Sequence, residues 1–153
     1  MADISLETVT GKLNQIGYDT FMQALRHAKG AGNRNLELEH WLLKILQMDR
    51  TDVALTADHF GVDKAVLLAD LQRTVDGFAM NKTEMPGISE NIIDVLDRAW
   101  HYATLLFGET QIRTGHILSA ALKETRMSRI LAGLSREFRK IDAEVLTNEH
   151  ARI

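Results

Sequence analysis

Two glutamates and a histidine stand close together in residues 35–46, NLELEHWLLKIL. Glu37 and His40 have the Glu-x-x-His spacing of helical di-iron sites, which need a second such motif and glutamates from two further helices. The histidine recurs in residues 111–122, QIRTGHILSAAL, but position 113 is arginine. The metal interpretation therefore lacks its second half.

A duplicated packing unit explains the same residues better. His40 and His116 are 76 residues apart, and the residues around them match in kind at that offset. The matching pairs are Leu36 with Ile112, Leu42 with Leu118, Leu46 with Leu122, and Leu55 with Leu131. Ala24 and Ala28 match Ala99 and Ala103 if one residue is inserted in the second turn. We interpret each histidine as a scaffold residue near a helix N-terminus that hydrogen-bonds a neighbouring backbone group or the other repeat.

Other chemistry finds little support in the sequence. It contains no Gly-x-x-x-x-Gly-Lys-Ser/Thr loop, no Gly-x-Ser-x-Gly and no His-Glu-x-x-His, so we expect neither catalysis nor a bound cofactor in this chain. The net charge is −3 without a clustered basic patch, which argues against nucleic acid as a partner. Absence of cysteine fits a reducing compartment. The N-terminus has no apolar run typical of a signal peptide, and no stretch is long enough to span a membrane.

The composition favours an all-α domain. The chain has 153 residues, 45% of them hydrophobic, and a single proline, a residue that helix interiors exclude. Apolar periodicity predicts helices over 5–12, 13–29, 38–48, 64–75, 115–123, 126–133 and 136–148, one ending near His59, and one from Ser89 to about Phe107. The expected N-caps are Ser5, either Thr51 or Asp52, Asp63, Ser89 and Thr114.

These elements divide into two copies of a four-helix unit. Repeat one covers about 13–75, residues 76–89 form a linker with two glycines and the proline, and repeat two covers about 90–148. Half the chain is too small to bury a core alone. We therefore expect one domain over 1–153, with the repeats packed across a pseudo-twofold axis and a short extra helix at the N-terminus.

Four stretches are similar to a known family. LETVTGKLN (6–14), LELEHWLLKIL (36–46), ISENIIDVLDRAW (88–100) and GETQIRTGHILSAAL (108–122) resemble the Clp N-terminal domain, the double four-helix module of Clp/Hsp100 AAA+ unfoldases. The resemblance covers nearly the whole chain and is sharpest to the branch of the type VI secretion ATPases. One departure is that relatives usually open the second repeat with an aromatic-Ser-Pro phrase, where this chain has Ile88-Ser89-Glu90.

The resemblance implies a binding function. In that branch the domain captures an N-terminal helix of the large sheath subunit, so that the AAA+ rings can disassemble contracted sheath. It implies a bacterial, cytoplasmic protein whose ATP and Mg²⁺ act in AAA+ rings beyond residue 153, with the isolated domain monomeric and the full-length protein hexameric. We place the groove on the N-terminal helix and the start of the next helix, with the linker and the start of repeat two as its other wall. The expected peptide-binding residues are Leu6, Glu7, Val9, Thr10, Leu13, Phe78, Ile88 and Arg98.

Two alternatives stay open from the sequence. A ClpB- or ClpA-type chaperone would use the same fold to bind exposed hydrophobic segments or an adaptor protein. A metal-dependent helical hydrolase would need a metal, and we expect its site to be empty in the purified protein. The apolar residues of the first helix also have a simpler explanation, which is that they cover the core.

Overall fold

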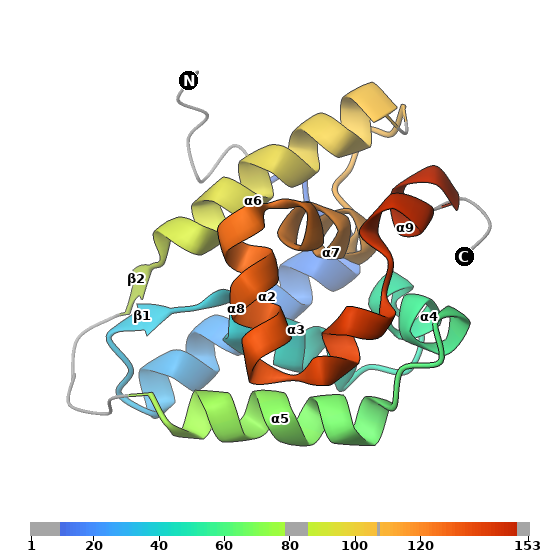
Figure 1. The fold of residues 1–153 in the computed structure, drawn as a ribbon. Helices are drawn as coiled ribbons and strands as arrows, with labels where there is room; N and C mark the ends of the chain where they lie inside the picture. The colour runs from blue at the N-terminus through green and yellow to red at the C-terminus, as the bar shows by residue number, and fades with distance from the viewer. Residues whose placement is uncertain (1–9, 79–85, 107, 150–153) are drawn as a thin grey trace.

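The computed structural model describes residues 10–78, 86–106 and 108–149, and within them it is built almost entirely of helices (Figure 1). The first half holds α2 (Gln15–Gly30), β1 (Asn35–Leu36), α3 (Leu38–Leu46), α4 (Asp52–His59) and α5 (Lys64–Asp76). The second half holds β2 (Gly87–Ile88), α6 (Glu90–His101), the π-helical turn η1 (Tyr102–Leu106), α7 (Thr114–Lys123), α8 (Thr125–Leu134), the 3₁₀ helix η2 (Arg136–Lys140) and α9 (Ala143–Glu149). The predicted all-α class is confirmed.

Polar N-caps start α4, α5 and α6 where the sequence predicts them. The side chains of Thr51, Asp63 and Ser89 each accept a backbone N–H from the first turn of the following helix. The predicted cap at Thr114 is wrong. Thr114 is the first residue of α7, and Arg113 is its N-cap. Residues 1–9, with the predicted cap Ser5 and most of the predicted helix 5–12, lie outside the described residues.

Two predicted helix boundaries are also wrong, each because a local contact competes with the helix. The helix expected from residue 13 begins at Gln15, since Asn14 caps it and Leu13 forms a parallel β-bridge to Ile112. The helix expected over 136–148 is broken into η2 and α9. Between them, the Asp142 carboxylate accepts the N–H groups of Glu144 and Val145, which caps a new helix.

Two short parallel pairings relate the repeats. Leu36, just before α3, pairs with Ile88, just before α6. Leu13, just before α2, pairs with Ile112, just before α7. The two pairings exchange the roles of the repeats, as a pseudo-twofold axis requires. Each repeat therefore starts its long helix from a backbone bridge to the other repeat.

The π-helical turn holds the extra residue of the second repeat. In repeat one, the N–H of Asn33 donates to the carbonyl of Ala28 at 2.9 Å. In repeat two, the N–H of Glu109 donates to the carbonyl of Ala103 at 2.7 Å, one residue further along. A single inserted residue widens a helical turn to the π form. The one-residue insertion that the sequence repeat predicts therefore lies in η1. Leu105 of this turn is 77% exposed.

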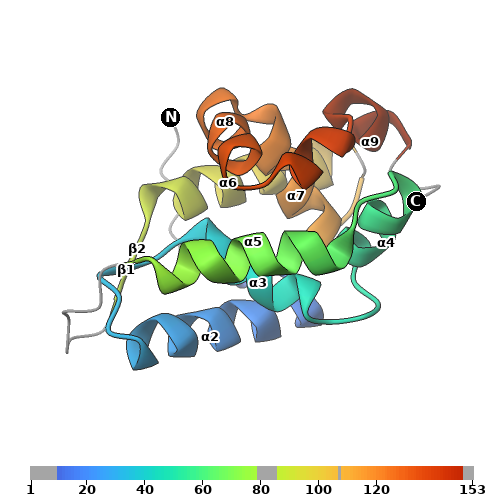
Figure 2. The ribbon, with the colours of Figure 1, turned by 60° about the horizontal axis from the view of Figure 1, so that its bottom comes forward.

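The helices of the two repeats form adjoining halves of one core. In Figure 2, α2, α3 and α5 lie in the lower half, and α6, α7 and α8 lie in the upper half. Almost every residue of α3 and of α7 is buried, so these two helices form the centre of the core. The matched pair Leu55 and Leu131 differs in burial, since Leu131 is fully buried and Leu55 is 46% exposed.

Trp41 is the largest fully buried side chain and ties α3 to α2. Its indole N–H donates to the hydroxyl of Thr20 at 3.1 Å, and its ring meets Phe21 edge to face with centroids 5.0 Å apart. The Thr20 hydroxyl in turn donates to the carbonyl of Ile16 at 2.7 Å. A buried indole with a satisfied N–H contributes to the core without an unpaired polar group.

Candidate peptide-binding site

Two described parts of the predicted site, Ile88 and the residues around Leu13, lie near opposite ends of α6. Ile88 lies directly before α6, while residue 12 reaches the other end, where the Lys12 ammonium sits 5.5 Å from the centre of the Trp100 ring. The axial rise of a helix makes α6, with 12 residues, about 18 Å long. The Lys12 contact was not predicted, because nothing in the sequence signals a pairing over such a separation.

Residues 12–14, called here the bridging segment, are held to the second repeat by backbone bonds. The N–H of Ile112 donates to the carbonyl of Lys12 at 2.7 Å, and the N–H of Asn14 donates to the carbonyl of Ile112 at 2.9 Å. Leu13 between them is only 5% exposed. Leu13 was expected to line the groove, but its side chain belongs to the core beneath it.

The remaining predicted residues differ in how the structure places them. Thr10 is half-buried just ahead of the bridging segment, and its carbonyl accepts the N–H of Leu13 at 3.1 Å. Leu6, Glu7 and Val9 lie outside the described residues. Ile88 is half-buried in β2.

Arg98 lies on a different side of α6 from Trp100. A helix turns 100° per residue, so Arg98 and Trp100 point in opposite directions around it. Arg98 lines a hollow between α6 and the start of α8, shared with Asp94, Asp97, His101 and Glu124. The structure therefore places Arg98 apart from Trp100, and its contact with the ligand stays a prediction.

An apolar stripe on α6 joins these two parts of the site. Ile93 and Trp100 are seven residues apart and therefore lie on the same side of the helix. Ile93 is 38% exposed and Trp100 is only partly buried. The two adjacent isoleucines, Ile92 and Ile93, were a signal in the sequence, since Ile92 alone fills the core position. We call Ile88, Ile93 and Trp100 the α6 surface.

Phe78, at the end of α5, packs away from the bridging segment and against the start of α3. Its ring centre lies 5.1 Å from that of His40, and the His27 ring lies 5.9 Å from His40 on another side. Asn33, Arg34, Asn35, Glu37 and Phe78 surround a small hollow at this place. Phe78 therefore belongs to the surroundings of His40, which is 1% exposed.

The two histidines cap helices, as the sequence repeat predicts. Nδ1 of His40 accepts the N–H of Glu37 at 2.9 Å, and Nδ1 of His116 accepts the N–H of Arg113 at the same distance. Because Nδ1 accepts, Nε2 of His40 carries the proton and donates to Asn33 Oδ1 at 2.9 Å. Burial, and secondarily the neighbouring His27 imidazole, lowers the pKa of His40 to about 4. His40 is therefore a neutral structural residue at neutral pH.

Glu39, next to His40, is a buried acidic residue and, among the described residues, not part of a metal site. Glu39 is 8% exposed, and burial raises the pKa of its carboxyl group. Within the part of the chain that the structure describes, no three histidine, cysteine or acidic side chains converge on a possible metal position.

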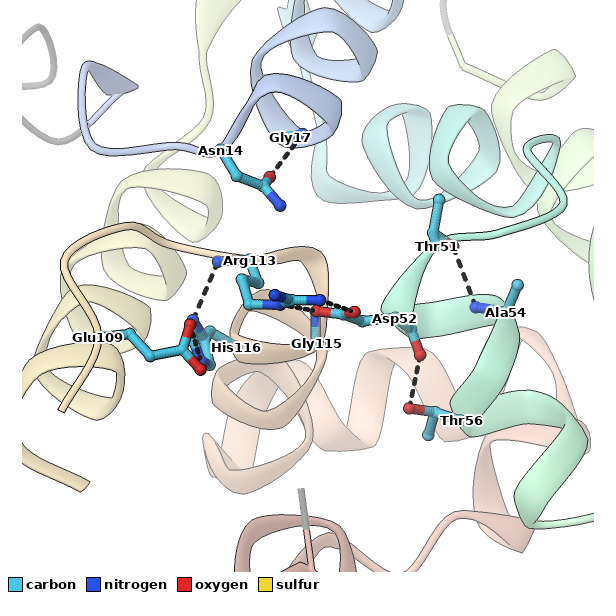
Figure 3. Close-up of polar contacts among 10 residues, drawn as sticks. All are labelled: Asn14, Gly17, Thr51, Asp52, Ala54, Thr56, Glu109, Arg113, Gly115 and His116. Carbon is cyan, nitrogen blue, oxygen red and sulfur yellow. Dashed lines mark hydrogen bonds and ion pairs between the residues drawn. The ribbon is translucent and has the colours of Figure 1, made fainter. Parts of the chain in front are cut away.

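Arg113 replaces the glutamate of the first repeat and forms an ion pair between the repeats (Figure 3). Its guanidinium donates two hydrogen bonds of 2.7 Å to the two carboxylate oxygens of Asp52, at the start of α4. The same carboxylate accepts the N–H of Gly115, in the first turn of α7, at 3.4 Å. The Asp52 carboxylate also raises the pKa of Arg113. In Figure 3, Glu109 points at His116, and Oε2 of Glu109 lies 3.9 Å from Nε2 of His116.

Two helical repeats joined by reciprocal backbone bridges define a double-repeat helical domain, and its surface carries a partly exposed apolar stripe. The family model of the Clp repeat N-terminal domain matches residues 12–134, so the chain belongs to this family. None of the helices in the described ranges is long and apolar enough to cross a membrane.

Two relatives above 30% identity and one solved structure with the same fold show what the chain is similar to. The AAA+ ATPase ClpV1 of Pseudomonas aeruginosa is 35% identical over 147 residues, which are 96% of this chain. A ClpV structure from work on the coevolution of ClpV, the TssB-TssC sheath and the accessory HsiE protein in type VI secretion is 34% identical, with a TM-score of 0.93 over 99% of this chain and 94% of that one. A ClpV N-domain in complex with a VipB peptide shares the fold, with a TM-score of 0.84 at 23% identity over 99% of this chain and 92% of that one.

The chain spans 16% of the length of the curated ClpV1 relative. In that relative the matching region is part of an AAA+ ATPase.

Proposed function

We propose that this domain recognises a helix from the N-terminus of the large sheath subunit of a type VI secretion system and recruits contracted sheath for disassembly. The main support is the likeness over nearly the full chain to ClpV proteins at 34–35% identity, together with the shared fold of a ClpV N-domain that binds a VipB peptide. In this proposal the ATP-driven step belongs to the AAA+ rings of a full-length, hexameric cytoplasmic ATPase, and the isolated domain is a monomer without a cofactor.

The ligand helix lies along the α6 surface. The distance from Ile88 to the bridging segment corresponds to the length of α6, so a ligand helix of about three turns would cover it. Such a helix presents apolar anchors at spacings of three, four and seven residues. Ile93 and Trp100, with their own spacing of seven, match that period. Thr10 and the preceding residues Leu6, Glu7 and Val9 are proposed to border the ligand at the Lys12 end.

Calorimetry with a synthetic N-terminal peptide of the large sheath subunit tests this placement. Ile88→Ala and Ile93→Ala should each weaken binding by about tenfold, because each removes an apolar contact at a partly exposed position. Leu55→Ala is the matched control, since Leu55 is an exposed aliphatic residue on α4, away from α6. Unchanged affinity in both α6 variants, with folding intact, would contradict the placement.

The sheath partner is tested separately from the groove. The domain immobilised on resin should retain the large sheath subunit from a lysate of a cell with a contracted sheath. Recovery of a mixture of unfolded proteins in place of the sheath subunit would contradict the proposed partner and support the role of a ClpB- or ClpA-type chaperone domain.

A further inference from the structure

The N-terminus of α7 receives its acidic partner from the other repeat. At the start of α3 the N-cap residue is an acid, Glu37, whereas the corresponding residue of α7 is Arg113. Asp52, at the start of α4, supplies a carboxylate to Arg113 and to the N–H of Gly115. An anion at this position is favourable because the first N–H groups of a helix carry partial positive charge.

The arrangement has no pseudo-symmetric counterpart at the start of α3. The residue 76 positions after Asp52 is Ser128, which carries no charge to offer to α3. The Asp52 side chain is only 16% exposed, and the fork of Arg113 meets both of its oxygens. Paired, bidentate geometry in a partly buried place makes this ion pair stronger than an ordinary surface pair.

Arg113 directly follows the residue that holds the bridging segment. Ile112 is fully buried and bonds through its backbone to both Lys12 and Asn14. Fixing the guanidinium of Arg113 restricts the backbone of Ile112, which in turn fixes residues 12–14. Lys12 in that segment lies over Trp100, at the end of the α6 surface.

We infer that Asp52 is a positioning residue for the peptide-binding site. By holding Arg113, it keeps the bridging segment in register against Ile112 and keeps Lys12 over Trp100, without itself contacting the ligand. The link to ligand affinity rests on the proposed function, whereas the link from Asp52 to the bridging segment does not.

Amide hydrogen exchange measured by NMR tests the structural link. In Asp52→Asn, the N–H groups of Asn14 and Ile112 should exchange about tenfold faster, because the charge-assisted pair is lost. The N–H of Ser89 is an internal control. It donates to Leu36 in the pseudo-symmetric bridge at 3.0 Å, which does not involve Asp52. Equal acceleration at all three amides would show a global loss of stability and overturn the inference, as would no acceleration at any of them.

Three further variants sharpen the result. Asp52→Glu keeps the carboxylate and should retain most of the protection at Asn14 and Ile112. Arg113→Lys keeps the charge but loses the bidentate fork, so the amides of Asn14 and Ile112 should exchange faster. This variant tests the structural link if Asp52→Asn does not fold. Lys64→Gln, which removes the exposed ion pair with Asp58 inside repeat one, should change none of these amides.

Calorimetry with the sheath peptide tests the functional link. Asp52→Asn should weaken binding several-fold at unchanged stoichiometry, and Asp52→Glu should restore it. If the wild-type domain fails to bind the peptide, the proposed function fails while the exchange result still stands. If the wild type binds and Asp52→Asn binds equally well despite faster exchange, the positioning role is overturned.

Discussion

Nδ1 of His40 lies 2.9 Å from the backbone nitrogen of Glu37 and accepts its N–H. The imidazole thereby takes the place of the glutamate or glutamine that reaches back to the N-cap in a capping box. The bond requires an unprotonated Nδ1, and the ring sits against His27 and Phe78 in the protein interior. One buried, neutral ring therefore links the start of α3 to the ends of α2 and α5.

Acidification should destabilise the domain through His40. An unfolded histidine takes up a proton near pH 6.5, whereas folded His40 does so only near pH 4. Between these values the unfolded state binds more protons, so the free energy of unfolding falls as the pH is lowered, by up to about 3 kcal/mol. Urea denaturation from about pH 7.5 to about pH 4 measures this slope.

His40→Gln should be less stable at neutral pH and should lose this part of the pH dependence. His59→Gln is the control, since His59 is exposed on α4. A slope that persists unchanged in His40→Gln would assign the pH dependence to other groups.

Trp41→Phe should destabilise the fold by about 1–3 kcal/mol, because it removes buried ring volume and the hydrogen bond to Thr20. The Thr20 hydroxyl keeps its bond to Ile16, so no buried donor is left unpaired. Thermal unfolding measures the loss. Trp100→Phe, at a partly exposed position, should cost less, and an equal or larger cost there would contradict this assignment of the core.

Deletion of Leu105 should be tolerated. Leu105 is largely exposed in the π-helical turn, and its removal would give repeat two the spacing that repeat one already has between Ala28 and Asn33. We expect a loss below about 1 kcal/mol by denaturant titration. Deletion of Leu96 is the control. It rotates the part of α6 before the deletion by 100° relative to the part after it, so the core positions no longer align and the domain should unfold. Unfolding by both deletions would show that η1 does not hold one inserted residue that the fold can lose.

Glu39→Gln should stabilise the domain at neutral pH. Burial raises the pKa of Glu39, so the folded state favours the protonated form and loses stability as the pH rises above the value for an unfolded glutamate. The amide is isosteric and carries no charge to bury. Parallel denaturation of both proteins at neutral and acidic pH should show a gain that shrinks on acidification, and a gain independent of pH would point to another cause.

Local pattern was enough to predict the helices and their duplication. The repeat is read directly from matching residues 76 positions apart, such as His40 and His116. The caps at Asp63 and Ser89 follow from residue type, because each cap depends on contacts within one helical turn. The boundaries that were wrong, at Leu13, Thr114 and residues 136–148, are those where a backbone bridge or a side-chain cap competes with helix propensity.

The candidate site was only partly predictable for the same reason. The sequence by itself determined the all-α class, the repeat and the scaffold role of His40. Only the tertiary structure decided that Leu13 is buried, that Lys12 covers Trp100, and that Asp52 supplies the acid missing from position 113. Each of these depends on which residues of one repeat meet the other, and sequence spacing carries no record of contacts made across the pseudo-twofold axis.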